Sequence, residues 1–183
     1  MTLDFRTLWD QALDLDAFVA EAKEQKDLWA GTYRLARIPD WARITISAGQ
    51  ERRLLALAED WCVDTASTLP VLAKWAAEVP GLSLRILQRD QHPEFMDQYL
   101  SNGARSIPVV VVLDNDFRDL DHWGPYPVPL GDWVKDHKPP ALVKEDFVKG
   151  KRTWYARDRG ETTLREVMGR LGVSPTARDG PPV

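Results

Sequence analysis

One cysteine, Cys62, lies in the run Trp61-Cys62-Val63-Asp64-Thr65 and is the only cysteine among 183 residues. A cysteine reacts with disulfides as its thiolate, so its chemistry depends on surroundings that favour the charged form. The apolar run 54–58 precedes Cys62 and a helix-like pattern follows it, which predicts a thiol at the point where a buried strand leads into a helix. The unpaired N–H groups and partial positive charge of a helix N-terminus favour a thiolate. Cys62 is therefore the candidate nucleophile.

Two neighbours are expected to modify this thiol. Asp64 falls in the first turn of the predicted helix, where its charge stabilises the helix but opposes ionisation of Cys62. A helix terminus contributes about 0.3–1 kcal/mol, which is less than about one pKa unit, so the carboxylate can cancel it. Thr65, one helical turn after Cys62, either donates a hydrogen bond to the thiolate or fills space near the helix start. We expect at most a moderately activated thiol.

The composition is that of an ordinary globular protein with one main domain, since 44% of the residues are hydrophobic and 28% are charged. A net charge of −4 gives no indication of the clustered basic face of nucleic-acid binders. The longest apolar run, 107–113, is far too short to cross a bilayer. Residues 1–6 lack the features of a signal peptide. We therefore expect a cytoplasmic protein that binds neither nucleic acid nor membranes.

Residues 1–48 predict a helical N-terminal extension packed on the core. One apolar stripe runs between charged residues and consists of Phe18, Val19, Ala22 and Trp29. Asp16 is the expected N-cap of this helix.

Residues 49–138 predict a core in which strands and helices alternate. Its expected elements are a buried strand at 53–58, a helix from 63 to about 79, a strand at 82–86, a short helix at 92–100, a strand at 107–113 and a returning strand at 117–123. This order predicts a parallel pair of strands with a right-handed crossover, followed by an antiparallel pair.

Residues 139–172 predict a C-terminal helical extension with a helix at 163–171, and another helix is expected around Trp133, just before this segment. The proline-containing residues 173–183 are expected to be a disordered tail. Eight tryptophans are many for this length, and we expect them to join the two extensions to the core, because each can bury a large area.

Two motifs together resemble those of the thioredoxin superfamily. The run from Trp61 to Thr65, followed by Pro70, is similar to the thioredoxin Trp-Cys-x-x-Cys sequence and its helix-kinking proline. The segment Ser106-Ile107-Pro108 resembles the thioredoxin loop whose Ile-Pro bond is cis and faces the active cysteine. The resemblance covers about 50–123 and implies an α/β, thioredoxin-like fold, a central mixed sheet flanked by helices, here with helical extensions.

Further short segments are similar to a bacterial branch of thioredoxin-like proteins with helical N- and C-terminal extensions. These segments are Asp60-Trp61-Cys62 and Trp123-Gly124-Pro125-Tyr126-Pro127.

Two departures from the thioredoxin pattern define the expected mechanism. Thr65 stands where thioredoxins carry the second, resolving cysteine, and Ala56 stands where they carry a buried acid that relays a proton to that cysteine. The loss of the second cysteine and the loss of the acid are consistent with each other, because a proton relay has no use without a second thiol. The chain thus resembles monothiol (Cys-x-x-Thr) members, in which one cysteine forms a mixed disulfide and an outside thiol resolves it.

The resemblance also implies the site residues. Cys62 and Thr65 are the expected catalytic pair. The expected substrate-binding residues are Trp61, Val63, Asp64, Ile107 and Pro108. A cis bond before Pro108 would turn the backbone of Ile107 towards an extended substrate, whereas a trans proline would only begin a strand.

No metal site is expected, because the histidines have no spacing that suits a metal: His92, His122 and His137. A Cys–His pair stays open, since such partners meet in space rather than in sequence. Peroxiredoxin chemistry would need a threonine before the cysteine, whereas Thr65 follows it. Glutathione-assisted iron–sulfur binding usually accompanies a Gly-Phe-Ser motif, which this sequence lacks. No cofactor is expected beyond a low-molecular-weight thiol as co-substrate.

The sequence therefore favours a cytoplasmic monothiol protein of thiol-disulfide exchange or redox protection, acting on protein or small-molecule disulfides. Two alternatives remain. One is a non-catalytic binding module that uses a groove between Trp61 and Pro108, in which Cys62 is only a small buried residue. The other is a redox sensor whose Cys62 pairs with another chain. The oligomeric state stays open.

Overall fold

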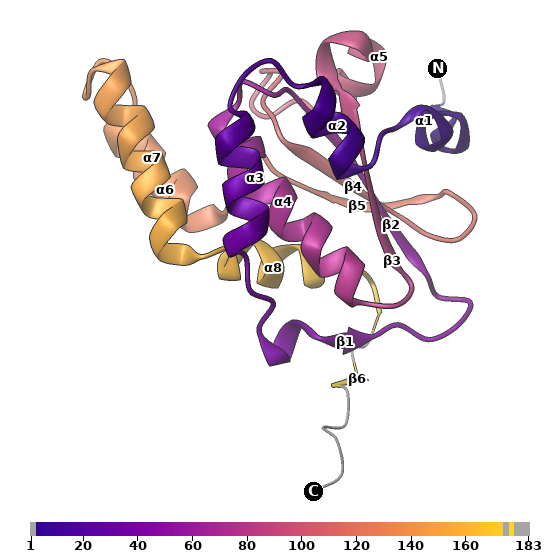
Figure 1. Ribbon diagram of the computed structural model, residues 1–183. Helices are drawn as coiled ribbons and strands as arrows, with labels where there is room; N and C mark the ends of the chain where they lie inside the picture. Colours follow the sequence, from indigo (N-terminus) through magenta and orange to yellow (C-terminus); the bar gives the residue numbers. More distant parts are fainter. Residues whose placement is uncertain (1–2, 174–175, 178–183) are drawn as a thin grey trace, which may run out of the picture.

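A four-stranded mixed sheet forms the centre of the computed structural model, which describes residues 3–173 and 176–177 (Figure 1). The strand order is β3-β2-β4-β5. β2 pairs in parallel with β3 and antiparallel with β4, and β4 pairs antiparallel with β5. The strands are β2 (Arg52–Ala58), β3 (Leu82–Gln88), β4 (Val109–Leu113) and β5 (Asp119–Trp123). The predicted mixed sheet, with one parallel pair and an antiparallel return, is confirmed.

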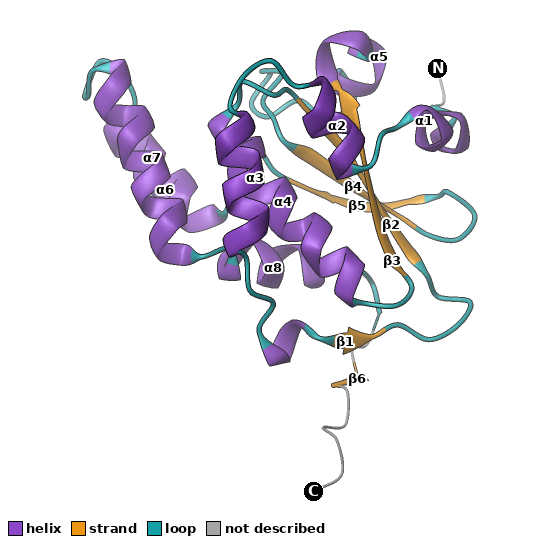
Figure 2. Ribbon diagram, in the orientation of Figure 1, coloured by secondary structure: helices purple, strands orange, loops and turns teal. Residues whose placement is uncertain are grey.

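The two central strands are apolar on both faces because helices and extensions cover both sides of the sheet (Figure 2). Alternate residues of β2 and β4 enter two separate buried clusters, with Ala56 and Val110 on one side and Leu57 and Val109 on the other. β4 begins after Pro108 rather than at Ile107, since proline has no N–H to contribute to a ladder.

The longest helix, α4 (Val63–Glu78), covers one face of the sheet and is buried along most of its length. α3 (Lys26–Leu35) packs on it from outside, together with α8 (Glu161–Met168). The other face is covered by α1 (Phe5–Gln11) and the short α5 (Pro93–Met96), whose Trp9, Phe95 and Met96 enter the second cluster. α5 is shorter than the predicted helix at 92–100, because the chain turns after Met96.

The N-terminal segment is helical as expected, with one corrected boundary. α2 (Leu15–Glu21) is capped by Asp14, whose Oδ1 accepts a hydrogen bond of 2.8 Å from the backbone N–H of Ala17. The prediction of Asp16 as the N-cap was wrong, and Asp16 lies in the first turn instead. The prediction of one helix for the whole apolar stripe was wrong, since α2 ends at Glu21 and Trp29 lies in α3. The rings of Phe18 and Trp29 are nevertheless both buried, with centroids 5.0 Å apart.

A short two-stranded sheet lies below the main one in Figure 1. A 3-10 helix (Asp40–Ala42) leads into β1 (Ile44–Thr45), which pairs antiparallel with β6 (Thr176–Ala177). The predicted tail at 173–183 falls mostly outside the described residues.

The C-terminal segment, expected to be helical over 139–172, contains a helix that was not placed individually from the sequence. α6 (Val128–His137), which contains Trp133, and α7 (Lys144–Asp158) stand together at the left of Figure 1. The indole of Trp133 stacks on His137, with centroids 4.4 Å apart, and on Phe147 at 5.7 Å. A Cβ on Gly150 would lie 2.5 Å from the Trp133 ring, so this glycine allows the two helices to approach. No helix in the described ranges is both long and apolar enough to span a membrane.

Gly124 connects β5 to the Pro108 loop by close backbone contact. Its φ is +130°, and a Cβ at this position would lie 2.0 Å from the carbonyl oxygen of Pro108. That distance is far inside van der Waals contact, and the obstacle is backbone, which cannot rotate away as a flexible side chain can.

We predict that Gly124→Ala destabilises the protein by more than about 4 kcal/mol, because a backbone clash adds to the cost of a positive φ. Gly49→Ala is the matched control, since Gly49 also has a positive φ (+84°), but a Cβ there would meet nothing within 4 Å beyond its chain neighbours. The control should cost about 1–2 kcal/mol. Urea unfolding measures both values, and equal losses would contradict the role given to the Pro108 contact.

Candidate functional site

The Cys62 thiol and the Ile107–Pro108 loop meet at one end of the sheet. Cys62 is the N-cap of α4, and its Sγ lies 3.6 Å from the carbonyl oxygen of Ile107. The bond between Ile107 and Pro108 is cis, so the alternative of a trans proline is wrong. The side chain is nevertheless well covered, because Cys62 is only 8% exposed.

The expected substrate-binding residues differ in their access to solvent. Trp61 is 42% exposed, and the guanidinium of Arg89 lies 5.3 Å from the centre of its ring. The others are buried in the structure: Val63, Asp64, Ile107 and Pro108. Trp61 is therefore the residue of this group that offers a large surface to a partner.

The Thr65 hydroxyl holds the turn before α4. It lies 2.8 Å from the carbonyl oxygen of Glu59 and 2.7 Å from that of Cys62, and both contacts direct the hydroxyl hydrogen to backbone. The side chain of Thr65 thus fixes the backbone around the thiol. Its backbone N–H acts on the sulfur as well, since it lowers the pKa of Cys62.

Opposing effects act on the ionisation of Cys62. Burial raises the pKa of its thiol above the ordinary value, and the charge of Asp64 raises it further. The backbone N–H groups of Thr65 and Asp64 and the charge of Lys151 lower this pKa without reversing the shift. The neutral thiol is favoured near pH 7, in line with a thiol that is at most moderately activated.

Asp64 is buried and receives two partners from α7. Its Oδ2 forms an ion pair with Nζ of Lys151, and its Oδ1 accepts a hydrogen bond of 2.8 Å from the hydroxyl of Tyr155. The side chain of Asp64 is 8% exposed and that of Lys151 is 13% exposed. Burial and the charge of Asp64 raise the pKa of Tyr155 well above its ordinary value, so Tyr155 donates as a neutral phenol.

Sequence reasoning missed Lys151 and Tyr155. The available signal was their separation by one helical turn, which places both on one face of a helix. A second signal was Asp64 itself, since a carboxylate in a buried helix start requires partners.

The N-terminal segment is tied to the same turn through Asp60. One carboxylate oxygen of Asp60 accepts hydrogen bonds from the backbone N–H groups of Lys23 (2.6 Å) and Glu24 (3.1 Å). Its carbonyl oxygen accepts a bond of 3.1 Å from the indole N–H of Trp29. Glu59 faces the other way, where its carboxylate accepts a bond of 2.8 Å from the backbone N–H of Asp90, and burial raises its pKa.

The histidines belong to other environments. The ring of His122 packs on Tyr99, and that of His137 packs on Trp133. Among the described residues, the charged side chains with the largest effect on the pKa of Cys62 are Asp64 and Lys151, and neither is a histidine. No three His, Cys, Asp or Glu side chains gather as a metal site within residues 3–173 and 176–177.

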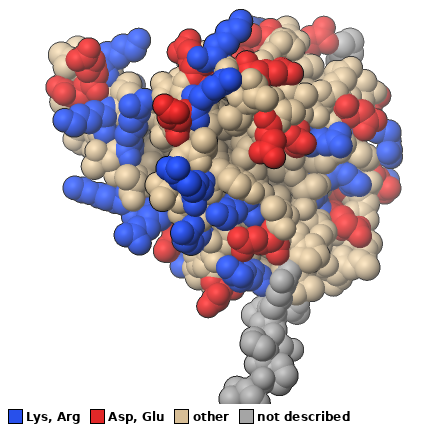
Figure 3. Space-filling model, in the orientation of Figure 1, with Lys and Arg blue, Asp and Glu red and all other residues tan. Residues whose placement is uncertain are grey.

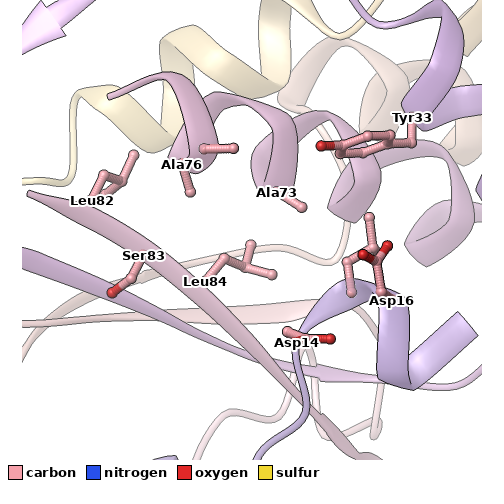
Figure 4. Close-up of a pocket in the computed structure, with 10 residues that line it drawn as sticks. Asp14, Asp16, Tyr33, Ala73, Ala76, Leu82, Ser83 and Leu84 are labelled. Atoms are coloured by element: carbon pink, nitrogen blue, oxygen red, sulfur yellow. The ribbon is translucent and has the colours of Figure 1, made fainter. Parts of the chain in front are cut away.

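Two surface features lie near the elements that carry Cys62: a group of basic side chains and a cavity. Figure 3 shows Lys and Arg side chains gathered over α7 and the parts of the body that face it. A cavity of about 310 Å³ opens between α2, α3, α4 and β3, with Asp14, Asp16 and Tyr33 at its rim and Ala73, Ala76 and Leu84 along its wall (Figure 4). None of the predicted site residues lines this cavity.

Comparisons with known proteins agree with this geometry. A family model described as thioredoxin matches residues 12–138. A protein of unknown function from Pseudomonas aeruginosa has a similar crystal structure, with a TM-score of 0.73 and 22% identity over 93% of this chain and 98% of that one. An HIV epitope-scaffold gives a TM-score of 0.71 and 21% identity over 94% of this chain and 100% of that one. At these identities the two structures show the fold alone. The search of curated proteins found no match.

We predict that Asp60→Ala lowers the free energy of unfolding by about 1–2 kcal/mol, because two backbone N–H groups lose a charged acceptor. Hydrogen exchange at the amides of Lys23 and Glu24 should accelerate in the variant. Asp10→Ala, at an exposed position of α1, should change stability by less than about 0.5 kcal/mol. Unchanged exchange at the two amides would show that Asp60 does not anchor the N-terminal segment.

Proposed function

The chain belongs to the thioredoxin family, and from this premise we propose that it is a monothiol protein of thiol-disulfide exchange whose reacting group is Cys62. The observation that carries the proposal is the distance of 3.6 Å between Cys62 Sγ and the carbonyl oxygen of Ile107. It brings the thiol at a helix start beside the backbone that precedes a cis proline. A disulfide docked along that backbone would lie against the sulfur.

The proposed reaction has two balanced steps. Cys62 loses its proton to solvent, and its thiolate attacks one sulfur of a disulfide R–S–S–R′. A Cys62–S–S–R bond forms while the S–S bond of the substrate breaks, and R′–S⁻ leaves and takes up a proton. A low-molecular-weight thiolate G–S⁻ then attacks the R sulfur of the mixed disulfide, the Cys62–S bond breaks, and R–S–S–G leaves while Cys62 returns as a thiolate and takes up a proton. A second molecule of the small thiol reduces R–S–S–G in solution to R–SH and G–S–S–G, so two electrons pass from two outside thiols to the substrate and Cys62 ends as it began.

The second step needs an outside thiol because the helix start offers none. Thr65 occupies the position one turn from Cys62, and its hydroxyl is held by two carbonyl oxygens. Ala56 lies buried in β2 where a proton-relaying acid would be required for a second cysteine. The Cys-x-x-Thr arrangement therefore supports a monothiol mechanism, with protein or small-molecule disulfides as substrates and the cytoplasm as the expected compartment.

Burial of the thiol favours a second candidate, a thioredoxin-fold binding module that performs no thiol chemistry. Cys62 is 8% exposed, and burial and Asp64 raise its pKa. In that case the exposed Trp61 would contact a partner while Cys62 only fills space. A redox sensor joined to another chain through Cys62 would require a partner to reach this covered sulfur.

Insulin reduction tests the proposal. The protein should reduce insulin poorly with a thioredoxin reductase alone, because no internal thiol releases the mixed disulfide, and adding glutathione should raise turnover. Glutathione disulfide should leave one adduct on Cys62, seen by mass spectrometry, and Cys62→Ser should abolish both signals. Efficient reduction without a small thiol would contradict the monothiol mechanism, whereas the lack of any adduct would favour the binding module.

Thr65→Cys should create a dithiol protein. A sulfur one helical turn from Cys62 recreates the Cys-x-x-Cys spacing, which can close a disulfide across a helix start. We expect internal oxidation and some insulin reduction without glutathione, below that of an ordinary thioredoxin because Ala56 supplies no acid. Thr65→Ser is the control and should stay inactive. Two free thiols that persist under a mild oxidant, counted by alkylation, would contradict this prediction.

A further inference from the structure

A buried charged cluster lies next to Cys62, and the exchange steps described above make no use of it. It consists of Asp64, at the start of α4, and Lys151 and Tyr155, on one face of α7. We propose that Lys151 and Tyr155 are positioning residues that act through Asp64 to set the nucleophilic strength of Cys62. This inference rests on the proposed function only in taking Cys62 as the reacting group.

The geometry makes Asp64 the point of connection. It follows Cys62 by two residues in the first turn of α4, and each of its carboxylate oxygens has its own partner on α7. Lys151 and Tyr155 are one helical turn apart, so the same face of α7 supplies both partners. The carboxylate is therefore held in one place beside the thiol.

The charges of Asp64 and Lys151 are what allow this cluster to change the ionisation of Cys62. An unpaired, buried carboxylate near a thiol opposes its ionisation, because two negative charges would share a poorly solvated space. The ammonium of Lys151 compensates the negative charge of Asp64. The phenol of Tyr155 stabilises the same carboxylate by donating a hydrogen bond to it. The cluster thus limits the penalty that Asp64 imposes on the thiolate.

The other groups around the thiol are accounted for. The Ile107 carbonyl oxygen faces the sulfur from the cis-proline loop, and it is neutral. Glu59 is turned towards the backbone N–H of Asp90, and Arg89 lies over the ring of Trp61. Asp64 and Lys151 are the charged residues with the largest effect on the pKa of the Cys62 thiol in the described part of the chain.

A purely structural role for the cluster predicts a different result. If the ion pair only fastens α7 over α4, loss of either partner loosens this cover and exposes Cys62. Both Lys151→Met and Asp64→Asn would then speed modification of the thiol, and the midpoint of its titration would move downwards in both variants, because exposure removes the effect of burial. The proposal instead predicts opposite effects from the two substitutions.

The test is the rate of alkylation of Cys62 by iodoacetamide in the full-length protein, followed across a series of pH values. Lys151→Met should slow the reaction at neutral pH about tenfold and move its midpoint upwards by about one pH unit, since Asp64 loses its compensating charge. Asp64→Asn should speed it about tenfold and move the midpoint downwards. In the double variant Lys151→Met should no longer slow the reaction.

Matched controls separate charge from fold. Lys151→Arg keeps the positive charge and should leave the midpoint at the value of the unaltered protein. Lys149→Met removes an exposed lysine of the same helix and should also leave the midpoint unchanged. Tyr155→Phe should raise the midpoint by less than Lys151→Met does, and it provides the readout if Lys151→Met does not fold. Faster alkylation in both single variants with midpoints that move downwards together, or no shift in any variant, would overturn the inference.

The outcomes also separate this inference from the proposed function. Alkylation reports the thiol itself and needs no disulfide substrate. Opposite shifts in the two variants, together with the absence of any glutathione adduct, would refute exchange and leave the role of the cluster intact. Formation of the glutathione adduct with unshifted midpoints would refute the role proposed for the cluster and leave the exchange mechanism intact.

Discussion

The polar groups of the turn between β2 and α4 must find partners inside the protein, and most of the architecture around the site follows from this constraint. Backbone and carboxylate groups that are buried without partners are costly. Three carboxylates in and beside this turn are satisfied by different parts of the chain: Glu59 by the segment that follows β3, Asp60 by the N-terminal segment, and Asp64 by α7. Thr65 closes the turn on itself. The Cys62 thiol is thus placed where three separate segments converge.

This convergence gives Cys62 an environment with two opposing tendencies. The helix start and Lys151 favour the thiolate, whereas burial and Asp64 favour the thiol, and the second pair prevails. A covered thiol of this kind is protected from unselective oxidation, because oxidants react with exposed thiolates first. In the exchange reaction that we propose, access to the sulfur requires a partner that displaces part of the cover. The exposed ring of Trp61 is the surface that such a partner would meet.

The parts that could be predicted from the sequence are those with a local signal. Strand alternation and the meeting of Cys62 with the Ile107–Pro108 loop follow from short motifs and hydrophobic periodicity. The cap of α2 was placed two residues too late, because Asp14 and Asp16 are equally good capping residues and sequence alone does not choose between them. α7 lies within the segment expected to be helical, but its bounds were not predicted, since its sequence is mostly charged and polar and gives no apolar stripe. Its contacts with the site join residues that are far apart in the chain, and such pairings leave no periodic signal.

The ion pair between Asp64 and Lys151 has a consequence for modularity. A thioredoxin-like core is usually regarded as a self-sufficient unit to which other segments are added. Here a fragment that ends before α7 would retain the cysteine and the cis-proline loop, but it would leave the carboxylate at the start of α4 without either of its partners. The same cut would remove Glu166, which accepts a hydrogen bond of 2.7 Å from the indole of Trp123 at the end of β5. The C-terminal helices thus supply partners to buried groups of the core, and they lie beyond residues 12–138, which match the family model.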